Sequence, residues 1–442
     1  MSVDPYGLGA LADPLPIEPV VGPLDAVVRV PGSKSVTNRA LVCAALASGT
    51  SVLEGALDAD DTRAMLGVLG ALGIAVRSSV DGTRMEIDGC GGAVPASDAE
   101  VDVRQSGTTA RFALPLLALG SGSYRVTAHP QMQARPMGET FAALRALGSG
   151  VEARAGADRL PATLSPDGGR SGVVRLAGDV SSQFLSGLLL SGPCRAGGLV
   201  VELTTDLVSR PYVDLTVAVM AAFGATVDQP DERTFAVAPG GYRAQSYQVE
   251  PDASAASYPL AAAAICGGSV TVEGLGSGAL QGDAAFADLL GAMGCDVART
   301  DAATTVSRPV DRPLAGGRFD LTHVSDTAQT LAVVAPYATG PVRIEGIGFI
   351  RRKEIDRIAA VATELARCGV PVRIDDDGWT IEPAAPQPAV IETSEDHRMA
   401  MSFALLGLRS EGIAIAGPAC VAKTFPGYWQ MLEGLRGAPG AR

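Results

Sequence analysis

A short stretch near the N-terminus combines the residue types that bind small anions. It spans residues 31–39, with the sequence PGSKSVTNR, and runs into the apolar segment 40–47. Proline and glycine end a preceding strand, and either serine can cap the helix that the apolar segment predicts. The first turn of a helix offers unpaired N–H groups, beside which Lys34 and Arg39 add positive charge. The stretch predicts a phosphate or carboxylate site, and a capped helix with two solvated cations explains it about as well.

The same pattern recurs along the chain with a period of about 72 residues. Each copy has a polar cap, an apolar helix, a glycine and an alternating strand, and the later copies begin near Ser106, Ser181, Asp252, Ser325 and Asp396. Most copies also predict a second helix that ends on glycine, at 64–73, 141–148, 215–224, 286–294 and 358–369. We therefore expect six units of helix, strand, helix and strands.

The length of 442 residues is too great for one ordinary core, so the repeats are expected to divide between two domains. The third repeat ends and the fourth begins around residues 247–252. We predict one continuous domain at 34–251 and one discontinuous domain at 1–33 plus 252–442. A strand before the first helix completes the discontinuous domain, and residues 1 to about 18 are expected to form a loose leader.

Composition excludes several functional classes. No apolar run is long enough to span a membrane, and the N-terminus has no cation before Arg29, unlike a signal peptide. A net charge of −13 argues against a nucleic-acid-binding surface. Seven single cysteines and three separated histidines argue against a cysteine or histidine metal site, and the unpaired cysteines favour a reducing cytoplasm.

The cations that matter lie at helix starts and not in runs. They are Lys34, Arg39, Arg111, Arg135, Arg210, Arg357, Arg398 and Lys423. An acidic protein with cations in these places can gather them around one small anionic ligand. The alternative is a set of scattered surface charges, which a sequence alone does not distinguish.

Carboxylates and neutral polar groups accompany these cations. Asp326 opens the fifth helix, and Glu354 is predicted to share a helix face with Arg357 because the two are three residues apart. A locally salt-bridged helix start is the alternative for that pair. The acidic segment 58–61 is interpreted as a helix N-terminus and not as a metal site. The polar segment 181–183 suits the hydroxyls of a sugar or cyclitol.

Nine motifs together resemble the EPSP synthase (3-phosphoshikimate 1-carboxyvinyltransferase) family of enolpyruvyl transferases. They occur in the family's order from about residue 20 to about 430: PGSKSVTNRAL at 31–41, SGTTAR at 106–111, ARP at 134–136, SSQFLSGLLL at 181–190, LVSRPY at 207–212, DASAASY at 252–258, KEIDR at 353–357, DHRMAM at 396–401 and AKTFP at 422–426. One such motif would be weak evidence, whereas the ordered set is strong.

The resemblance implies a two-domain inverse α/β prism built from six βαβαββ repeats, with the active site in the cleft between the domains. It also implies transfer of the enolpyruvyl group of phosphoenolpyruvate to the 5-hydroxyl of shikimate 3-phosphate, without metal or organic cofactor. The expected partners are these two small-molecule substrates, with no nucleic acid and no membrane. We expect a cytoplasmic monomer.

The resemblance also assigns roles to residues. The phosphoenolpyruvate site is expected to comprise Lys34, Gly107, Arg135, Gln183, Arg357, Arg398 and Lys423. The shikimate 3-phosphate site is expected to comprise Lys34, Ser35, Arg39, Ser181, Ser182, Gln183, Ser209, Tyr212, Asp326 and Lys353. Asp326 resembles the base at the attacking hydroxyl, Glu354 resembles the acid that protonates the methylene carbon, and Lys34 is a further catalytic candidate. His397 is expected to position other groups.

Four positions depart from the family pattern: Gln105, Phe112, Ile355 and Phe349. None of them removes a mapped charged residue. They bear on sensitivity to the family's herbicide, glyphosate, and to a lesser degree on the choice of acceptor.

Four other functions fit parts of the pattern. The related transferase acting on UDP-N-acetylglucosamine uses a loop cysteine, and no cysteine lies between Cys90 and Cys194 here. A paralogue that modifies another cyclitol stays open. A non-catalytic anion-binding repeat protein is disfavoured by Asp326 and Glu354, and a nucleic-acid-processing relative is disfavoured by the acidic balance.

Overall fold

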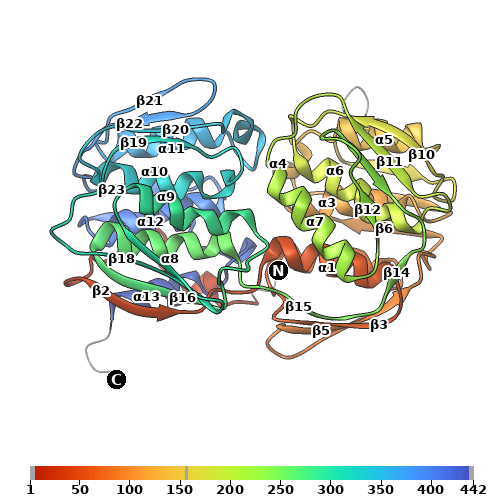
Figure 1. Ribbon diagram of the computed structural model, residues 1–442, viewed down its shortest axis with the longest axis horizontal. Helices are drawn as coiled ribbons and strands as arrows, with labels where there is room; N and C mark the ends of the chain where they lie inside the picture. The colour runs from red at the N-terminus through yellow and green to blue at the C-terminus, as the bar shows by residue number, and fades with distance from the viewer. Residues whose placement is uncertain (1–4, 155–157, 438–442) are drawn as a thin grey trace. The chain divides into compact units, whose positions relative to one another are not determined.

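The computed structural model describes residues 5–154 and 158–437, which form two compact units. Unit 1 comprises residues up to 31 and from 251 onward, and unit 2 comprises residues 32–250 (Figure 1). Each unit contains three small sheets and is described separately. Among the described residues, no helix combines the length and apolar character needed to cross a lipid bilayer.

Unit 2 contains three consecutive copies of the predicted repeat. The first has α1 (Lys34–Leu46), β3 (Ala47–Glu54), α2 (Asp60–Ala71), β4 (Val76–Ser78) and β5 (Arg84–Cys90). The second has β6 (Asp98–Asp102), α3 (Gly107–Leu117), β7 (Ser123–Thr127), α4 (Pro130–Gln133), α5 (Gly138–Ala146), β8 (Gly150–Ala153) and β9 (Ala162–Ser165). The third has β10 (Gly172–Leu176), α6 (Ser182–Ser191), η2 (Gly192–Cys194), β11 (Leu199–Leu203), α7 (Arg210–Ala222), β12 (Val227–Asp228) and β13 (Thr234–Val237), followed by β14 (Tyr242–Arg243) and β15 (Ser246–Gln248).

The sheets of unit 2 share one topology, with strand orders β6-β7-β9-β8, β10-β11-β13-β12 and β14-β3-β5-β4. Each of these orders begins with a parallel pair and continues with antiparallel pairs. A parallel pair needs a crossover, which α3 and α6 supply in two of the sheets. In the remaining sheet the parallel partners of β3 are β14 and β15, so the last strands of the unit complete its first repeat.

Unit 1 contains the other three repeats. The fourth has β2 (Leu24–Val28), α8 (Ala253–Cys266), β16 (Gly268–Glu273), η3 (Gly282–Ala285), α9 (Phe286–Ala292), β17 (Asp296–Arg299) and β18 (Ala303–Arg308). The fifth has β19 (Gly317–Asp320), η4 (Ser325–Thr327), α10 (Ala328–Val334), η5 (Ala335–Tyr337), β20 (Val342–Glu345), η6 (Gly348–Arg352), α11 (Arg357–Arg367), β21 (Val372–Ile374) and β22 (Trp379–Ile381). The sixth has β23 (Ala389–Glu392), α12 (His397–Gly407), β24 (Ile413–Ala416), η7 (Pro418–Lys423) and α13 (Tyr428–Arg436).

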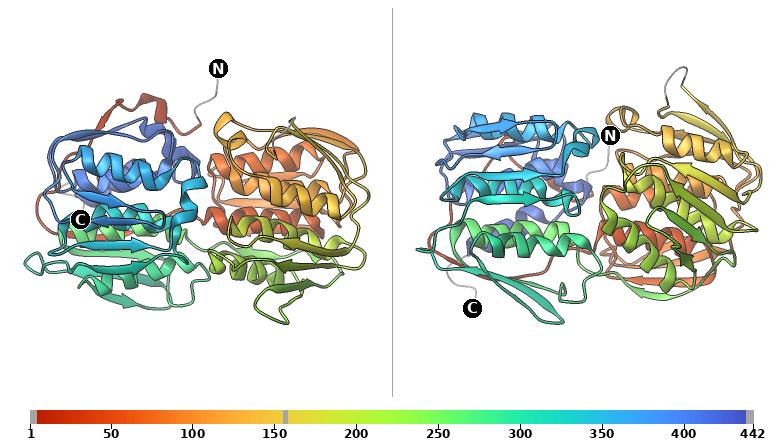
Figure 2. Two further views of the ribbon diagram at one scale, coloured as in Figure 1. Left: turned by 90° about the horizontal axis from the view of Figure 1, so that it is seen from above. Right: turned by 45° about the horizontal axis from the view of Figure 1, so that its top comes forward.

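Two sheets of unit 1 repeat this topology, in the orders β2-β16-β18-β17 and β19-β20-β22-β21. The N-terminal strand β2 pairs in parallel with β16, as predicted for the strand that completes this unit. The third sheet has the order β1-β24-β23, with β1 (Leu15–Pro16) antiparallel to β24. Figure 2 shows the green, teal and blue repeats of unit 1 following one another.

The prediction of a loose leader at residues 1–18 is wrong for its described part. Leu8, in the turn η1 (Leu8–Ala10), and Ile17 are buried in the core of unit 1. The backbone N–H of Ile17 also donates to the Ile413 carbonyl at 2.9 Å, beside the β1–β24 pair. The sixth repeat contributes only the parallel pair β23–β24 to its sheet, and the leader strand β1 adds an antiparallel pair to it.

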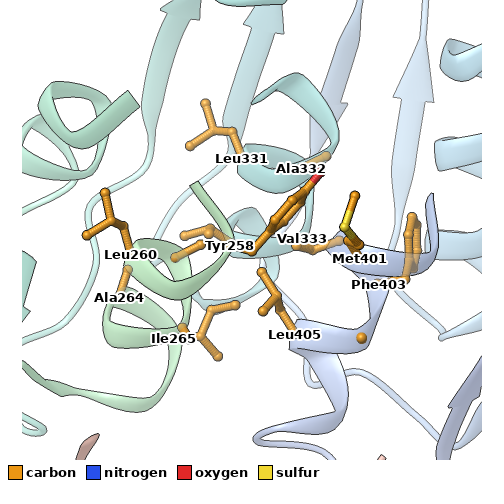
Figure 3. Packing of buried hydrophobic residues seen from close by; sticks show 14 of the residues in the cluster. Tyr258, Leu260, Ala264, Ile265, Leu331, Ala332, Val333, Met401, Phe403 and Leu405 are labelled. Carbon is orange, nitrogen blue, oxygen red and sulfur yellow. The ribbon is translucent and has the colours of Figure 1, made fainter. Parts of the chain in front are cut away.

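The centre of unit 1 is formed by the helices α8, α10 and α12, whose residues are all buried. A helix that is apolar on every side is expected in such a position. Figure 3 shows side chains of the three helices packed together, among them Tyr258, Leu331 and Leu405. A chain of buried hydroxyls also crosses the three helices, with 3.1 Å between Ser257 and Thr330 and 3.3 Å between Thr330 and Ser402. Helices α1, α3 and α6 are similarly buried in unit 2.

Candidate active site

Five of the six inner helices begin at a residue whose side chain caps the helix. Ser33, Ser106 and Ser181 accept hydrogen bonds from backbone N–H groups of α1, α3 and α6. Asp252 and Asp396 do the same for α8 and α12. The fifth helix begins differently, with the 3₁₀ turn η4 that carries Asp326. Capping satisfies some of the N–H groups at each start and fixes the direction of the residues beside it.

A buried arginine organises the charged residues of unit 1. Arg357 is 1% exposed and donates from Nε and Nη2 to the Asp396 carboxylate at 2.8 and 3.2 Å. Its Nη2 also lies 2.8 Å from Glu354 Oε2, and its Nη1 lies 3.6 Å from Asp326 Oδ1. Burial alone would lower the pKa of this guanidinium, but the Asp396 and Glu354 carboxylates outweigh it and raise the pKa. Three carboxylates therefore surround one permanent cation.

Three further cations complete this cluster, which we call the unit 1 charge cluster. Arg398 donates from Nη2 to Asp326 Oδ2 at 2.7 Å, and Lys353 Nζ lies 3.7 Å from Asp326 Oδ1. Lys423 Nζ lies 4.0 Å from Glu354 Oε1. All of these side chains are at most 20% exposed. The cluster comprises Asp326, Lys353, Glu354, Arg357, Asp396, Arg398 and Lys423. It can present several cations to an anionic substrate beside the Asp326 and Glu354 carboxylates.

The predicted helix face shared by Glu354 and Arg357 is wrong, although the two side chains do form an ion pair. Helix α11 begins at Arg357 and is capped by Asp356, whose side chain accepts from the Ala359 N–H. Glu354 lies in the bend between η6 and α11. Its carboxylate is thus held by Arg357 and Lys423 and not by helical geometry.

His397 follows the cap of α12 and is buried. Burial lowers its pKa well below the ordinary value, and the neighbouring Arg398 charge lowers it further. The folded protein therefore keeps the imidazole neutral at neutral pH. A neutral imidazole beside these cations adds no repulsion, and the positioning role of His397 stays a prediction.

We expect the neutral state of His397 to make the folded protein less stable in acid. The unfolded chain protonates histidine near pH 6.5 while the folded protein does not, so the free energy of unfolding should fall below that pH. In the wild type this fall approaches about 1.4 kcal/mol per pH unit below pH 6.5, and in His397→Gln it should be absent. Urea unfolding of both proteins at pH 7.0 and 5.5 measures the difference. Equal acid losses in both proteins would show that His397 does not contribute.

In unit 2, two arginines pack against the start of α3. Arg111 and Arg135 are nearly buried, and a side chain at Gly107 would overlap both guanidinium groups. Arg111 donates to the Gly107 and Pro136 carbonyls and to Gln183 Oε1, each at 3.2 Å. Gln183 Nε2 in turn donates to Thr108 Oγ1 at 3.3 Å. The starts of α3 and α6 are thereby joined into one cationic, hydrogen-bonding surface.

Lys34, the first residue of α1, is connected to the start of α3 through Asp61 of α2. Its Nζ is 3.7 Å from Asp61 Oδ2, and the Asp61 carboxylate is 4% exposed. The Asp61 carbonyl accepts from Thr109 Oγ1 at 3.1 Å, which joins α2 to α3. The interpretation of the acidic segment 58–61 as only a helix N-terminus was therefore incomplete. The cap position of α2 is Ala59, and Asp61 is an ion-pair partner of Lys34.

Arg39 connects two further predicted residues of unit 2, Ser35 and Tyr212. This buried guanidinium donates to Thr216 Oγ1 at 2.7 Å, to the Ser35 carbonyl at 2.9 Å and to the Tyr212 carbonyl at 3.0 Å. Burial lowers its pKa to about 10. Ser209, just before α7, has a left-handed backbone with φ 53°, an uncommon conformation for a non-glycine residue. Arg39 therefore ties the backbone of Ser35 to that of Tyr212.

Ser181 and Ser182, at the start of α6, are the last of the predicted residues. Ser181 is the cap and Ser182 is 5% exposed. Within residues 5–154 and 158–437, no group of three or more His, Cys, Asp or Glu side chains is arranged to hold a metal ion.

Comparison with known proteins identifies the family. The model of the family described as EPSP synthase (3-phosphoshikimate 1-carboxyvinyltransferase) matches residues 20–432. The chain belongs to the EPSP synthase family. A 3-phosphoshikimate 1-carboxyvinyltransferase of Nostoc punctiforme is 43% identical over 426 residues, covering 95% of this chain and 100% of the relative. A protein of the same name from Aliivibrio fischeri is 40% identical over 430 residues, covering 95% and 99%.

Solved structures agree with this family assignment. An EPSP synthase from Acinetobacter baumannii superposes with a TM-score of 0.80 at 26% identity, covering 95% of this chain and 97% of that one. The enolpyruvyl transferase NikO from Streptomyces tendae has a TM-score of 0.75 at 20% identity, which shows the fold alone. The family resemblance and the enolpyruvyl transferase fold predicted from the motifs are confirmed.

Two carboxylates of this EPSP synthase family member were missed by sequence reasoning as partners of site residues: Asp61 pairs with Lys34, and Asp396 pairs with Arg357. Arg111, which packs against Gly107, was predicted only as one of the cations that could gather around an anion. Asp396 belongs to the DHRMAM motif, so its place in a motif was the available signal. Asp61 gave no such signal, because its acidic neighbours suggested only a helix start.

Proposed function

We propose that the protein is a 3-phosphoshikimate 1-carboxyvinyltransferase. It transfers the enolpyruvyl group of phosphoenolpyruvate to the 5-hydroxyl of shikimate 3-phosphate and releases inorganic phosphate. Family membership over residues 20–432 supports this reaction. The structural observation that supports this reaction most directly is a pair of carboxylates at the buried Arg357 guanidinium. Asp326 lies at one of its terminal nitrogens and Glu354 at the other.

The donor is proposed to bind through cations because it carries both a phosphate and a carboxylate. In unit 1 its ligands are Arg357, Arg398 and Lys423, and in unit 2 they are Lys34, Gly107, Arg135 and Gln183. Arginine suits both groups since its planar fork can donate two parallel hydrogen bonds to one anion. The unit 1 charge cluster supplies three of these cations already held by carboxylates.

The acceptor is proposed to bind through hydroxyl and amide groups together with a few charges. In unit 2 these are Lys34, Ser35, Arg39, Ser181, Ser182, Gln183, Ser209 and Tyr212, and in unit 1 they are Asp326 and Lys353. Arg39 also holds the Ser35 and Tyr212 backbones, so part of its contribution is to shape the site.

The proposed mechanism is addition followed by elimination. Glu354 donates a proton to the methylene carbon of phosphoenolpyruvate, which makes the adjacent carbon electrophilic. Asp326 accepts the proton of the 5-hydroxyl as its oxygen bonds to that carbon. The new methyl group then returns a proton to Glu354 as the bond between the tetrahedral carbon and the phosphate oxygen breaks, which restores the double bond. Phosphate leaves with the proton that Asp326 had accepted. Acid–base groups and cations are sufficient for each step, so we propose no cofactor.

We further propose that the enzyme acts as a cytoplasmic monomer on these two small molecules. All seven cysteines are free thiols, as expected for a protein of a reducing compartment. Analytical ultracentrifugation of the purified protein tests the oligomeric state.

A phosphate-release assay tests the proposed function. Phosphate should appear only when shikimate 3-phosphate and phosphoenolpyruvate are both present. UDP-N-acetylglucosamine in place of shikimate 3-phosphate should give none. Release with the nucleotide sugar, or no release with the two proposed substrates, would contradict the proposal.

Arg398→Ala should weaken phosphoenolpyruvate binding by about 1.5–3 kcal/mol, since a hydrogen bond to a charged group typically contributes that much. Binding of shikimate 3-phosphate alone, followed by calorimetry, should change little. Arg318→Ala is the matched control, because Arg318 is an exposed arginine of unit 1 paired with Glu345. Equal loss of both ligands in a folded Arg398 variant would refute the assignment.

A further inference from the structure

Tyr258 is a buried tyrosine of α8 with no role in the proposed site. It is 1% exposed and packs among apolar side chains of α10 and α12 (Figure 3). Burial raises its pKa to about 12, so the hydroxyl keeps its proton at neutral pH. A buried tyrosine hydroxyl usually has a hydrogen-bond partner, and the identity of that partner indicates what the group does.

The partner of the Tyr258 hydroxyl is the donor-site arginine. Arg398 Nη1 points its N–H at Tyr258 Oη across 3.5 Å, a contact longer than an ordinary N–H···O hydrogen bond. The other terminal nitrogen of the same guanidinium, Nη2, donates to Asp326 Oδ2 at 2.7 Å. The planar group is therefore contacted at both terminal nitrogens, by a catalytic carboxylate and by a neutral hydroxyl.

The ring of Tyr258 is itself fixed by an aromatic cluster. It packs edge-on against Tyr428, with 5.6 Å between ring centroids, and Tyr428 packs against Phe425 and Trp429. The Tyr428 hydroxyl donates to the Met401 carbonyl at 2.6 Å, which attaches the cluster to α12. Rings packed in this way have little rotational freedom, so the Tyr258 hydroxyl has a defined place.

We propose that Tyr258 is a positioning residue that orients the Arg398 guanidinium for the donor substrate. It does not touch the substrate but limits rotation of the arginine about its long side chain. Part of the cost of ordering that side chain is then met before phosphoenolpyruvate binds. The inference rests on the proposed function and adds a determinant of donor affinity to it.

Tyr258→Phe tests this role, because it removes the hydroxyl and keeps the ring. The KM for phosphoenolpyruvate should rise about 3–10-fold, less than for the loss of a short hydrogen bond to a charged group, because the contact is long. The kcat and the affinity for shikimate 3-phosphate should stay within about twofold, since the substitution leaves Asp326 and Glu354 in place.

Tyr428→Phe is the matched control within the same cluster. It also removes a buried hydroxyl, but that hydroxyl binds a backbone carbonyl and not Arg398. It should lower the melting temperature without changing the KM for phosphoenolpyruvate. If the two variants behave alike, Tyr258 has only a structural role and the proposal is wrong.

A double-mutant cycle completes the test. In an Arg398→Ala background, Tyr258→Phe should change the KM by less than about twofold, because its partner is gone. Independent, multiplying effects would overturn the proposal. An active wild type with an unchanged Tyr258→Phe variant would refute this inference alone, whereas an inactive wild type would refute the proposed function with it.

Discussion

Asp326→Asn should lower kcat by about 10²–10⁴-fold, the range expected when a placed proton acceptor is lost. Asparagine keeps the size and some hydrogen bonding of aspartate but cannot take a proton from the 5-hydroxyl. The carboxylate is held by Arg398 at 2.7 Å and lies 3.7 Å from Lys353, so its position is set by the unit 1 charge cluster. Steady-state kinetics with shikimate 3-phosphate and phosphoenolpyruvate measure the effect.

Asp320→Asn is a suitable control for this experiment. Asp320 is an exposed aspartate at the end of β19, and its carboxylate accepts from Thr322. The control should keep wild-type turnover, and both variants should bind shikimate 3-phosphate within about tenfold of the wild type. Near-normal turnover of the folded Asp326 variant would assign the base to another group.

Glu354→Gln should lower kcat by a similar factor, about 10²–10⁴-fold, because the amide cannot protonate the methylene carbon. Arg357 and Lys423 contact Glu354 at 2.8 and 4.0 Å, and a neutral glutamine would leave those two cations less balanced. Tighter binding of the anionic donor is therefore expected alongside the slower chemistry. The signature is a fall in kcat without a rise in the KM for phosphoenolpyruvate.

Reaction in deuterated water separates the roles of the two carboxylates. Deuterium uptake into the methylene group of recovered phosphoenolpyruvate reports reversible protonation of that carbon. Uptake should fall most in the Glu354 variant. If that variant exchanges deuterium at the wild-type rate, the acid is another group, and Lys34 becomes the next candidate.

The repeats and the helix starts could be predicted because their signals are local. A capping serine or aspartate, an apolar run and a glycine lie within one short segment, and Ser33, Ser106 and Asp396 do cap their helices. The family motifs also include residues that the structure brings together, such as Arg357 and Arg398 around Asp326. Local rules and motif order were sufficient for this part.

Pairings between distant residues could not be predicted in this way. Arg357 and Asp396 are 39 residues apart, and Lys34 meets Asp61 only because α1 and α2 pack together in unit 2. The three-residue spacing of Glu354 and Arg357 suggested a helix, but the helix begins only at Arg357. The leader was misjudged because Leu8 and Ile17, its buried residues within the described part of the chain, are not spaced with the period of a helix or a strand.

The structure of the product is the most direct test of the account. Phosphoenolpyruvate labelled with carbon-13 at the carbon that bears the phosphate oxygen should be incubated with unlabelled shikimate 3-phosphate and the protein. Nuclear magnetic resonance then follows the labelled carbon. The account predicts one equivalent of inorganic phosphate and an enol ether in which the labelled carbon is joined to the oxygen at position 5, with the 3-phosphate intact. A labelled carbon joined to any other oxygen of the acceptor, or phosphoenolpyruvate that stays unchanged with the folded wild-type protein, would contradict it.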